Sequence, residues 1–134
     1  MPDSNTPDTA ALPVTHRGSV LPEWIDYNGH MNVAYYVLAF DHATDGLLDA
    51  LHMDAAYRKE SGRSNFVLEM HVTYDREIDQ DAPFEITTQV LDADVKRIHL
   101  VHEMRHARDG WLAASNELIT MHIDLARRRS AAFP

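Results

Sequence analysis

Hydrophobic residues recur at steps of three and four along residues 33–51 of this chain. This spacing places them on one face of an α-helix, which turns once in about 3.6 residues. The positions concerned are Val33, Tyr36, Val37, Phe40, Leu47, Leu48 and Leu51. Asn32 precedes them and can cap the helix by accepting a free backbone N–H. The pattern predicts one helix over about residues 32–51, although Gly46 within it costs roughly 1 kcal/mol relative to Ala.

After residue 65 the pattern changes to an alternation of apolar and polar side chains, which is typical of half-buried β-strands. The strands predicted in this way cover residues 66–74, 84–90, 96–107 and 111–125, with a weaker candidate at 14–20. Residues 77–82 predict a turn. Asp109-Gly110 predicts a hairpin, because these residue types readily adopt positive φ. The polar residues 54–63 predict a connection with room for one more helical turn.

The predicted order is therefore one strand, one long helix and four strands joined by short turns. This order indicates an α+β fold in which an antiparallel sheet wraps around the helix. One helix cannot cover both faces and the edges of such a sheet, so we expect a second copy of the chain to cover part of it. The sequence therefore predicts at least a homodimer.

Length and composition limit the possible classes of protein. The 134 residues suit one domain, placed at residues 13–126 between a flexible N-terminal tail (1–12) and a C-terminal tail (127–134). The net charge of −9 argues against nucleic acid as the main partner, because binding phosphates requires a basic surface.

Three further features favour a cytoplasmic protein that does not enter membranes. The chain has no cysteine, as is common in a reducing compartment. It has no apolar run approaching the ~20 residues that span a bilayer. Its first residues, MPDSNTPDTAALP, lack the basic and apolar regions of a secretory signal.

Residues 102–106 read His-Glu-Met-Arg-His, which matches the H-E-x-x-H pattern of zinc proteases. That chemistry requires a helix, which brings His102, Glu103 and His106 to one face. The flanking residues alternate and lead into an Asp-Gly turn, so we predict a strand, on which the two imidazoles lie roughly 13 Å apart. The segment is interpreted as polar residues on a solvated strand face, and a zinc metalloprotease remains a remote alternative.

Polar groups are concentrated in residues 23–32, EWIDYNGHMN, directly before the predicted helix. A turn at Asn28-Gly29 followed by a helix cap at Asn32 would explain them structurally. They are also the parts of an acyl-transfer site. The carboxylate of Asp26 can act as nucleophile or general base, backbone N–H groups at a helix start can stabilise an oxyanion, and Gly29 lets a substrate approach the backbone.

The motif Asp-x-x-Gly-His-x-Asn at residues 26–32, opening a long helix, resembles that of the hot-dog-fold acyl-CoA thioesterases, and of their 4-hydroxybenzoyl-CoA thioesterase-like branch in particular. The resemblance covers about residues 14–125. The segments FVLEMHVTYDREI (66–78) and DAPFEITTQV (81–90) look like the second and third strands of that family. The run EWIDYNGHMNVAYYVLAFDHATDGLL is similar to thioesterases associated with carnitine degradation, whose substrate class is betainyl-CoA.

The resemblance implies roles for individual residues at the helix start. Asp26 matches the family's catalytic aspartate, which attacks the thioester carbonyl or activates a water, and the N–H of Val33 matches its carbonyl-polarising amide. Gly29, His30 and Asn32 match the residues that shape the motif. His30 is either an orienting or proton-handling group or a structural bridge between loop and helix.

The resemblance also implies roles for residues away from the helix start. Glu69 could act across a dimer, although a solvated acid on the strand face is the favoured interpretation. Members of the family bind CoA phosphates at subunit boundaries. The candidates for this role, each of which could instead be plain surface charge, are Arg58, Lys59, Arg63, Lys96 and Arg97.

Aromatic side chains near Asp26 bear on the acyl group. Their faces can hold an aryl group, or a quaternary ammonium through cation–π attraction. The candidates are Trp24, Tyr27, Tyr35, Tyr36 and Tyr74, of which the last three could instead belong to the core. We therefore expect hydrolysis of a small acyl-CoA, with betainyl-CoA as one candidate, by a homodimer or homotetramer that needs no cofactor and no metal. A catalytically silent domain that binds CoA esters or serves as a scaffold is the alternative.

Overall fold

The computed structural model describes residues 12–134, so the predicted N-terminal tail lies almost entirely outside the described residues. The strands are β1 (Val14–Ser19), β2 (Arg63–Tyr74), β3 (Pro83–Ala93), β4 (Arg97–His106), β5 (Leu112–Asp124) and β6 (Arg129–Ser130). The helices are α1 (Val33–Ala50), α2 (Ala55–Ser61) and a short 3-10 turn at Pro22–Trp24. No helix among the described residues is long and apolar enough to cross a membrane.

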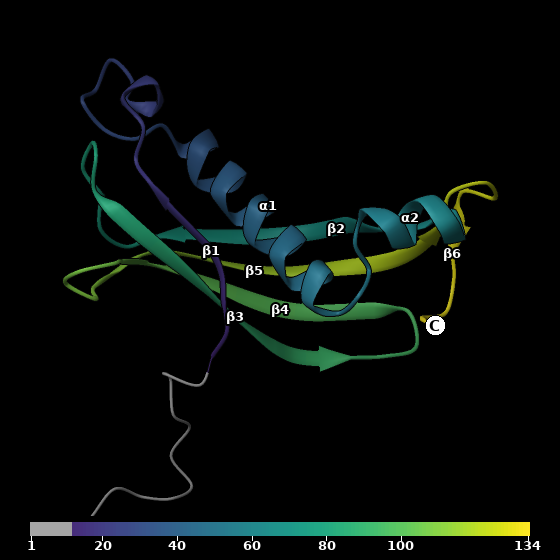
Figure 1. The fold of residues 1–134 in the computed structure, drawn as a ribbon. Helices are drawn as coiled ribbons and strands as arrows, with labels where there is room; N and C mark the ends of the chain where they lie inside the picture. The colour runs from purple at the N-terminus through teal and green to yellow at the C-terminus, as the bar shows by residue number, and fades with distance from the viewer. Residues whose placement is uncertain (1–11) are drawn as a thin grey trace, which may run out of the picture.

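A single antiparallel sheet curves around α1, which lies across one of its faces (Figure 1). The order of the strands in the sheet is β1-β3-β4-β5-β2, and β6 adds a short pairing to β5. The predicted α+β fold, with one long helix against an antiparallel sheet, is confirmed. The second helical turn that the polar connection allowed is α2, capped by the Asp54 carboxylate, which accepts from the N–H of Tyr57 at 3.0 Å.

The strands that follow one another in sequence are not all neighbours in the sheet. β2 pairs with β5 at one edge, whereas β3 pairs with β1 and β4 on the other side. The connection at residues 75–82 therefore crosses from one side of the sheet to the other and is not a hairpin. β2 is consequently an edge strand with one described neighbour.

The core lies between α1 and the concave face of the sheet. One cluster surrounds the first half of α1 through Tyr36 and Phe40, and includes Phe84 and Ile86 of β3. A second cluster surrounds the last turns of α1 and includes Leu100 and Leu118. Alternate residues of β3, β4 and β5 are buried, as the period of two requires.

Gly46 occupies the point where α1 crosses β1. A Cβ atom at this position would lie 2.1 Å from the backbone oxygen of Thr15. The glycine therefore permits close contact between helix and strand, and this contact explains why a residue of low helix propensity stands in the middle of α1.

The predicted C-terminal tail at 127–134 needs correction, because this segment packs against the domain. Arg129 and Ser130 form β6, and the N–H of Phe133 donates to the backbone oxygen of Val95 at 2.7 Å. His122 of β5, which is fully buried, bonds the backbone oxygen of Ala131 through Nδ1 at 3.0 Å. Its Nε2 lies 2.7 Å from the Tyr57 hydroxyl, so one imidazole joins α2, β5 and the C-terminal segment.

The H-E-x-x-H segment lies in β4, as the alternation predicted, and not in a helix. The interpretation of a solvated face is wrong for His102, which has no exposed surface and lies parallel to the ring of Phe40. Its Nδ1 lies 2.7 Å from the Thr88 hydroxyl and its Nε2 lies 2.8 Å from the Thr44 hydroxyl. This imidazole links β3, β4 and α1. Within residues 12–134, no three His, Asp or Glu side chains gather in a way that could hold a metal ion, so the metalloprotease alternative finds no support in this segment.

Candidate functional site

The segment before α1 forms a closed turn. Ile25 pairs with Met31 as an isolated bridge, the N–H of Asp26 donates to the His30 oxygen at 3.0 Å, and the N–H of Gly29 donates to the Asp26 oxygen at 3.0 Å. Gly29 has φ of +77°, a left-handed conformation that glycine adopts without steric cost. The predicted turn is confirmed, and it fixes the position of Asp26 relative to the start of the helix.

The Asp26 side chain is half-buried and accepts two hydrogen bonds from its own turn. Oδ1 accepts from the N–H of Asn28 at 2.8 Å, and Oδ2 accepts from Nδ2 of Asn32 at 3.1 Å. The Oδ1 atom of Asn32 meanwhile accepts from the N–H of Ala34 at 2.9 Å and so caps α1. Asn32 therefore holds the carboxylate and the helix start in one rigid unit.

The first residue of α1 presents a free amide beside this unit. The Val33 N–H donates to no acceptor within residues 12–134, and the residue is 58% exposed. The start of a helix carries a partial positive charge, because its first N–H groups have no partner within the helix. A carbonyl oxygen that becomes negatively charged during a reaction would be stabilised at this position.

A cavity of about 200 Å³ opens next to Val33 between the start of α1 and the end of β2. We call it the helix-start cavity. It is lined by His30, Met31, Val33, Tyr36, Tyr74, Asp75, Arg76 and Glu77. Nδ1 of His30 lies 3.0 Å from Oε2 of Glu77. This contact joins the loop before α1 to the segment after β2. The Tyr74 hydroxyl donates to the Val33 backbone oxygen at 3.4 Å.

The five aromatic candidates divide into three groups. Tyr36 and Tyr74 meet edge to face, with ring centroids 5.1 Å apart, at the helix-start cavity. Trp24 and Tyr35 stack on each other at 5.4 Å with an interplanar angle of 11°, and neither lines this cavity. Tyr27 is 96% exposed at the tip of the turn. The structure therefore brings two of the five to the space beside Val33.

Glu69 does not reach the helix-start cavity of its own chain. It pairs with Ile119 of β5, which alternates along its strand with the buried residues Leu118 and Thr120. Residues directly opposite in an antiparallel pair share one face, so Glu69 lies on the face of the sheet away from α1. There it lines a surface pocket that also includes His99.

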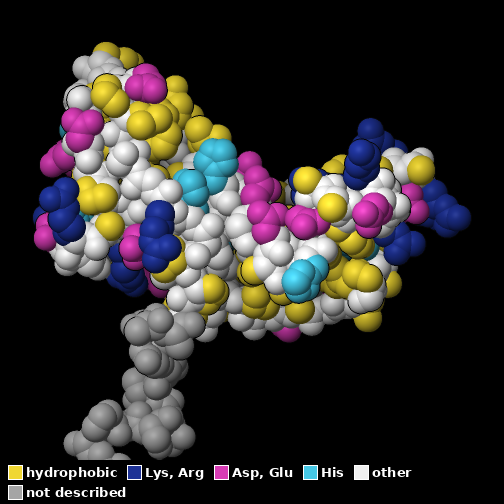
Figure 2. All heavy atoms as spheres, viewed as in Figure 1, with side chains coloured by type: hydrophobic (Ala, Val, Ile, Leu, Met, Phe, Trp, Pro, Cys, Tyr) yellow, Lys and Arg dark blue, Asp and Glu magenta, His cyan; other side chains and the backbone are white. Residues whose placement is uncertain are grey.

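The basic candidates lie at the other end of the molecule from Val33. Arg58 and Lys59 are in α2 and Arg63 begins β2, next to the last turn of α1 (Figure 1). A group of Lys and Arg side chains covers this end in Figure 2. Because α1 has 18 residues, it separates them from Val33 by about 27 Å in the same chain.

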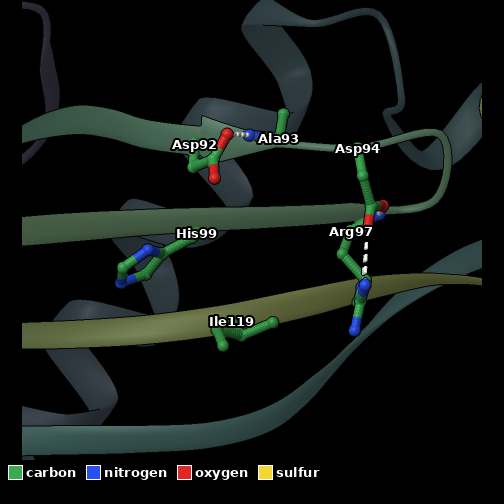
Figure 3. Close-up of a pocket in the computed structure, with 6 residues that line it drawn as sticks. All are labelled: Asp92, Ala93, Asp94, Arg97, His99 and Ile119. Atoms are coloured by element: carbon green, nitrogen blue, oxygen red, sulfur yellow. Dashed lines mark hydrogen bonds and ion pairs between the residues drawn. The ribbon is translucent and has the colours of Figure 1, made fainter.

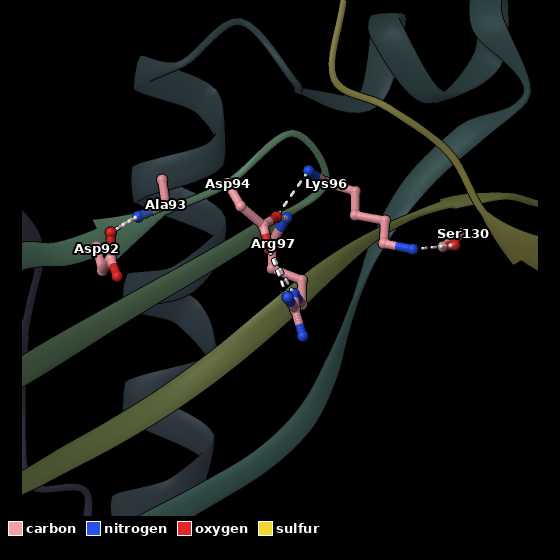
Figure 4. Close-up of polar contacts among 6 residues, drawn as sticks. All are labelled: Asp92, Ala93, Asp94, Lys96, Arg97 and Ser130. Atoms are coloured by element: carbon pink, nitrogen blue, oxygen red, sulfur yellow. Dashed lines mark hydrogen bonds and ion pairs between the residues drawn. The ribbon is translucent and has the colours of Figure 1, made fainter.

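Lys96 and Arg97 are engaged by neighbouring residues. Nη2 of Arg97 lies 2.6 Å from Oδ2 of Asp94, on the face of the sheet away from α1 (Figure 3). Hydrogen bonds lower the pKa of Asp94 to about 2, and the largest contribution comes from the backbone N–H of Lys96, the next from the Arg97 side chain. This carboxylate is therefore charged at neutral pH. Nζ of Lys96 donates to the Ser130 hydroxyl at 3.2 Å (Figure 4). Arg58, Lys59 and Arg63 are the candidates with fewer such contacts.

Sequence reasoning missed Asp75, Arg76 and Glu77, which line the helix-start cavity directly after β2. Polar residues between two strands look like an ordinary turn. The informative signal is the aromatic residue Tyr74 at the end of β2. Side chains alternate between the two faces of a strand, so Tyr74 lies on the same face as Val72, toward the helix. Polar residues that continue from such a strand end reach the start of the covering helix.

The chain is similar to several known proteins. The family model described as thioesterase-like superfamily matches residues 20–134. A betainyl-CoA thioesterase of Pseudomonas aeruginosa is 40% identical over 119 residues, which cover 89% of this chain and 75% of that protein. An L-carnitine dehydrogenase/betainyl-CoA thioesterase of Agrobacterium fabrum is 34% identical over 89% of this chain, which spans only 24% of that longer protein.

A solved structure also resembles the chain closely. A hypothetical protein of Staphylococcus aureus, determined in complex with CoA, superimposes with a TM-score of 0.86 at 33% identity, covering 92% of this chain and 78% of that one. The family match includes residues 127–134, consistent with the packed C-terminal segment.

Proposed function

We propose, from the premise that this chain belongs to the thioesterase-like superfamily and has its hot-dog fold, that it hydrolyses betainyl-CoA and that Asp26 is the acting carboxylate. The family and its relatives show that the chain is an acyl-CoA thioesterase. Betainyl-CoA as the substrate, and the roles of Asp26 and of the Val33 N–H, are what we propose. The observation that carries it is the unit formed by Asp26, Asn32 and the free N–H of Val33, in a chain 40% identical to a betainyl-CoA thioesterase.

The geometry supports two routes with the same products. In the first, the thioester oxygen accepts the Val33 N–H while Asp26 attacks the carbonyl carbon; the C–S bond breaks, CoA leaves as a thiolate, and water hydrolyses the mixed anhydride. In the second, Asp26 takes a proton from a water that attacks the carbonyl, and this proton passes to the leaving thiolate. Both routes require Asp26 to act as a carboxylate, which the hydrogen bonds from Asn28 and Asn32 hold in place.

The free edge of β2 supports a homodimer. Its exposed apolar side chains are Phe66, Val67, Leu68, Met70 and Tyr74. An edge strand with such side chains is a template for pairing with a second chain. Antiparallel pairing of two β2 strands places the beginning of one strand beside the end of the other.

In that dimer the CoA candidates of one copy approach the catalytic unit of the other. Arg63 stands at the beginning of β2, next to α2, and Tyr74 stands at its end, next to Val33. Arg58, Lys59 and Arg63 of a second copy would therefore lie near the helix-start cavity, where they could bind the CoA phosphates. The length of α1, which separates these basic residues from Val33 within one chain, then does not prevent CoA from contacting both.

Replacement Asp26→Asn tests the proposal. The amide oxygen of an asparagine can still accept from the N–H of Asn28, so the turn should persist while the charge is lost. We expect kcat/KM for CoA release from betainyl-CoA, followed by a thiol reagent, to fall by at least about 100-fold, with the circular dichroism spectrum and the molar mass unchanged. Wild-type turnover in this variant would remove Asp26 from its role.

The matched control is Asp54→Asn. The Asp54 carboxylate, like that of Asp26, accepts a hydrogen bond from a nearby backbone N–H, but it caps α2, away from Val33. It should keep wild-type turnover. A wild-type protein that binds betainyl-CoA and releases no thiol would instead support the catalytically silent alternative.

A further inference from the structure

The structure assigns the helix-start cavity to the quaternary ammonium head of the acyl group, with Tyr74 and Glu77 as the residues that select a cation; we propose this recognition site on the basis of the proposed function. The cavity of about 200 Å³ is large enough. The trimethylammonium group and its methylene have five heavy atoms, which need about 150 Å³ at the ~30 Å³ that a water molecule occupies in the liquid.

The position of the cavity follows from the chemistry of the substrate. In a betainyl thioester the nitrogen is two bonds from the carbonyl carbon, so the cation must lie directly beside the group that binds the carbonyl oxygen. Val33, whose free N–H suits that role, lines the helix-start cavity. Trp24 and Tyr35 are less suitable for the cation, because their faces are stacked against each other.

Two tyrosine rings form the aromatic wall of the cavity. Tyr36 is buried and Tyr74 is about half exposed, and they meet at an interplanar angle of 86°. Each hydroxyl is tethered: that of Tyr36 accepts from the Ile78 N–H at 3.4 Å, and that of Tyr74 donates to the Val33 oxygen at 3.4 Å. Rings held in this way can present a face to a cation without first losing side-chain freedom.

The charged groups at the cavity favour a cation. Glu77 and Asp75 contribute two carboxylates, and Glu77 already pairs with His30. The positive charge of Arg76 is drawn to the ring of Trp111, with its Cζ 4.1 Å from the ring centroid.

Carboxylates near the cavity also act on Tyr36. Burial is the largest cause that raises the pKa of its hydroxyl, the hydrogen bond with Ile78 opposes it, and the negative charges of Glu77 and Asp79 raise it further. Of these causes, only the negative charges of Glu77 and Asp79 also favour a cation, because burial disfavours a charge of either sign.

A pair of substrates of nearly equal shape tests the proposal. 3,3-Dimethylbutanoyl-CoA replaces the quaternary nitrogen of betainyl-CoA by carbon and therefore differs in charge but hardly in size. We expect the wild-type dimer to prefer betainyl-CoA in kcat/KM by about tenfold or more. Tyr74→Leu, which removes the ring, and Glu77→Gln, which removes the charge, should each lower this ratio several-fold, whereas Tyr74→Phe should keep most of it.

Glu117→Gln is the matched control for Glu77→Gln. Glu117 forms a histidine pair of the same 3.0 Å length, with His99, on the face of the sheet away from α1. It should leave the ratio unchanged.

The outcomes separate this proposal from the proposed function. If both thioesters are hydrolysed and the wild-type ratio is near one, or if the ratio is the same in Tyr74→Leu and Glu77→Gln as in the wild type, the recognition site is refuted while the thioesterase function stands. If the wild type hydrolyses neither thioester, the proposed substrate and the recognition site both fail. A high ratio that falls in both variants and persists in Glu117→Gln supports the site.

Discussion

His102 should make the stability of this protein depend on pH between about 4 and 6.5. Burial lowers the pKa of this imidazole from 6.5 to about 4. Its two hydrogen-bond partners are the hydroxyls of Thr88 and Thr44, so no carboxylate of residues 12–134 bonds the ring to compensate a positive charge. The folded protein therefore keeps His102 neutral at pH values where the unfolded chain would protonate it.

The size and sign of the effect follow from this difference. Below pH 6.5 the unfolded chain binds a proton that the folded protein refuses, so the free energy of unfolding falls as the pH is lowered and levels off below about 4. At about 1.4 kcal/mol per pKa unit, the contribution lost by pH 4 is about 3 kcal/mol. This is a large share of the 5–15 kcal/mol that typically stabilises a domain.

Urea unfolding followed by circular dichroism at several pH values between 7 and 4 measures this contribution. His102→Gln retains a donor and an acceptor but cannot be protonated, so its free energy of unfolding should depend less on pH than that of the wild type. His52→Gln, at an exposed position, should keep the wild-type dependence. Equal slopes for the wild type and His102→Gln, or a His102 pKa near 6.5 measured by NMR, would refute the reasoning.

Two further predictions concern packing and assembly. Gly46→Ala should destabilise the protein by roughly 1–3 kcal/mol in urea unfolding. The new Cβ would lie 2.1 Å from the Thr15 oxygen, and this clash outweighs the ~1 kcal/mol gain in helix propensity. A variant more stable than the wild type would contradict the described contact. Leu68→Lys, at the exposed edge of β2, tests the proposed homodimer: it should reduce the molar mass measured by light scattering to that of one chain and abolish CoA release. Val95→Lys, exposed in the β3–β4 turn, should change neither. An unchanged mass for Leu68→Lys would refute the proposed pairing of two β2 strands.

The elements of the fold could be predicted because each depends on a local pattern of apolar, polar and turn residues. The apolar spacing after Asn32 gives α1 to within a residue, and Asp109-Gly110 gives the β4–β5 hairpin, where Gly110 has φ of +78°. The neighbours of β2 could not be predicted. Alternation encodes which side chains face the core but not which strand lies alongside, so a crossing connection looks the same as a hairpin turn.

The candidate site was predictable in its first half only. The motif around Asp26 is contiguous, and all its contacts lie within a few residues. The opposite wall of the helix-start cavity is formed by residues 74–77, more than forty positions later, and nothing local connects them to the helix. The burial of His102 was misjudged for the same reason, since its partner Thr44 lies in α1.

The pairing of β1 with β3 has a consequence for synthesis of the chain on the ribosome. Val14 pairs with Thr87, about 70 residues later, and α1 covers a sheet whose strands all follow it except β1. Residues 14–50 therefore emerge with an apolar helix face and an unpaired strand before the strands that cover them in the folded domain. The turn that carries Asp26 is made early but cannot reach its final surroundings until the later strands arrive, and closing such distant contacts is slow.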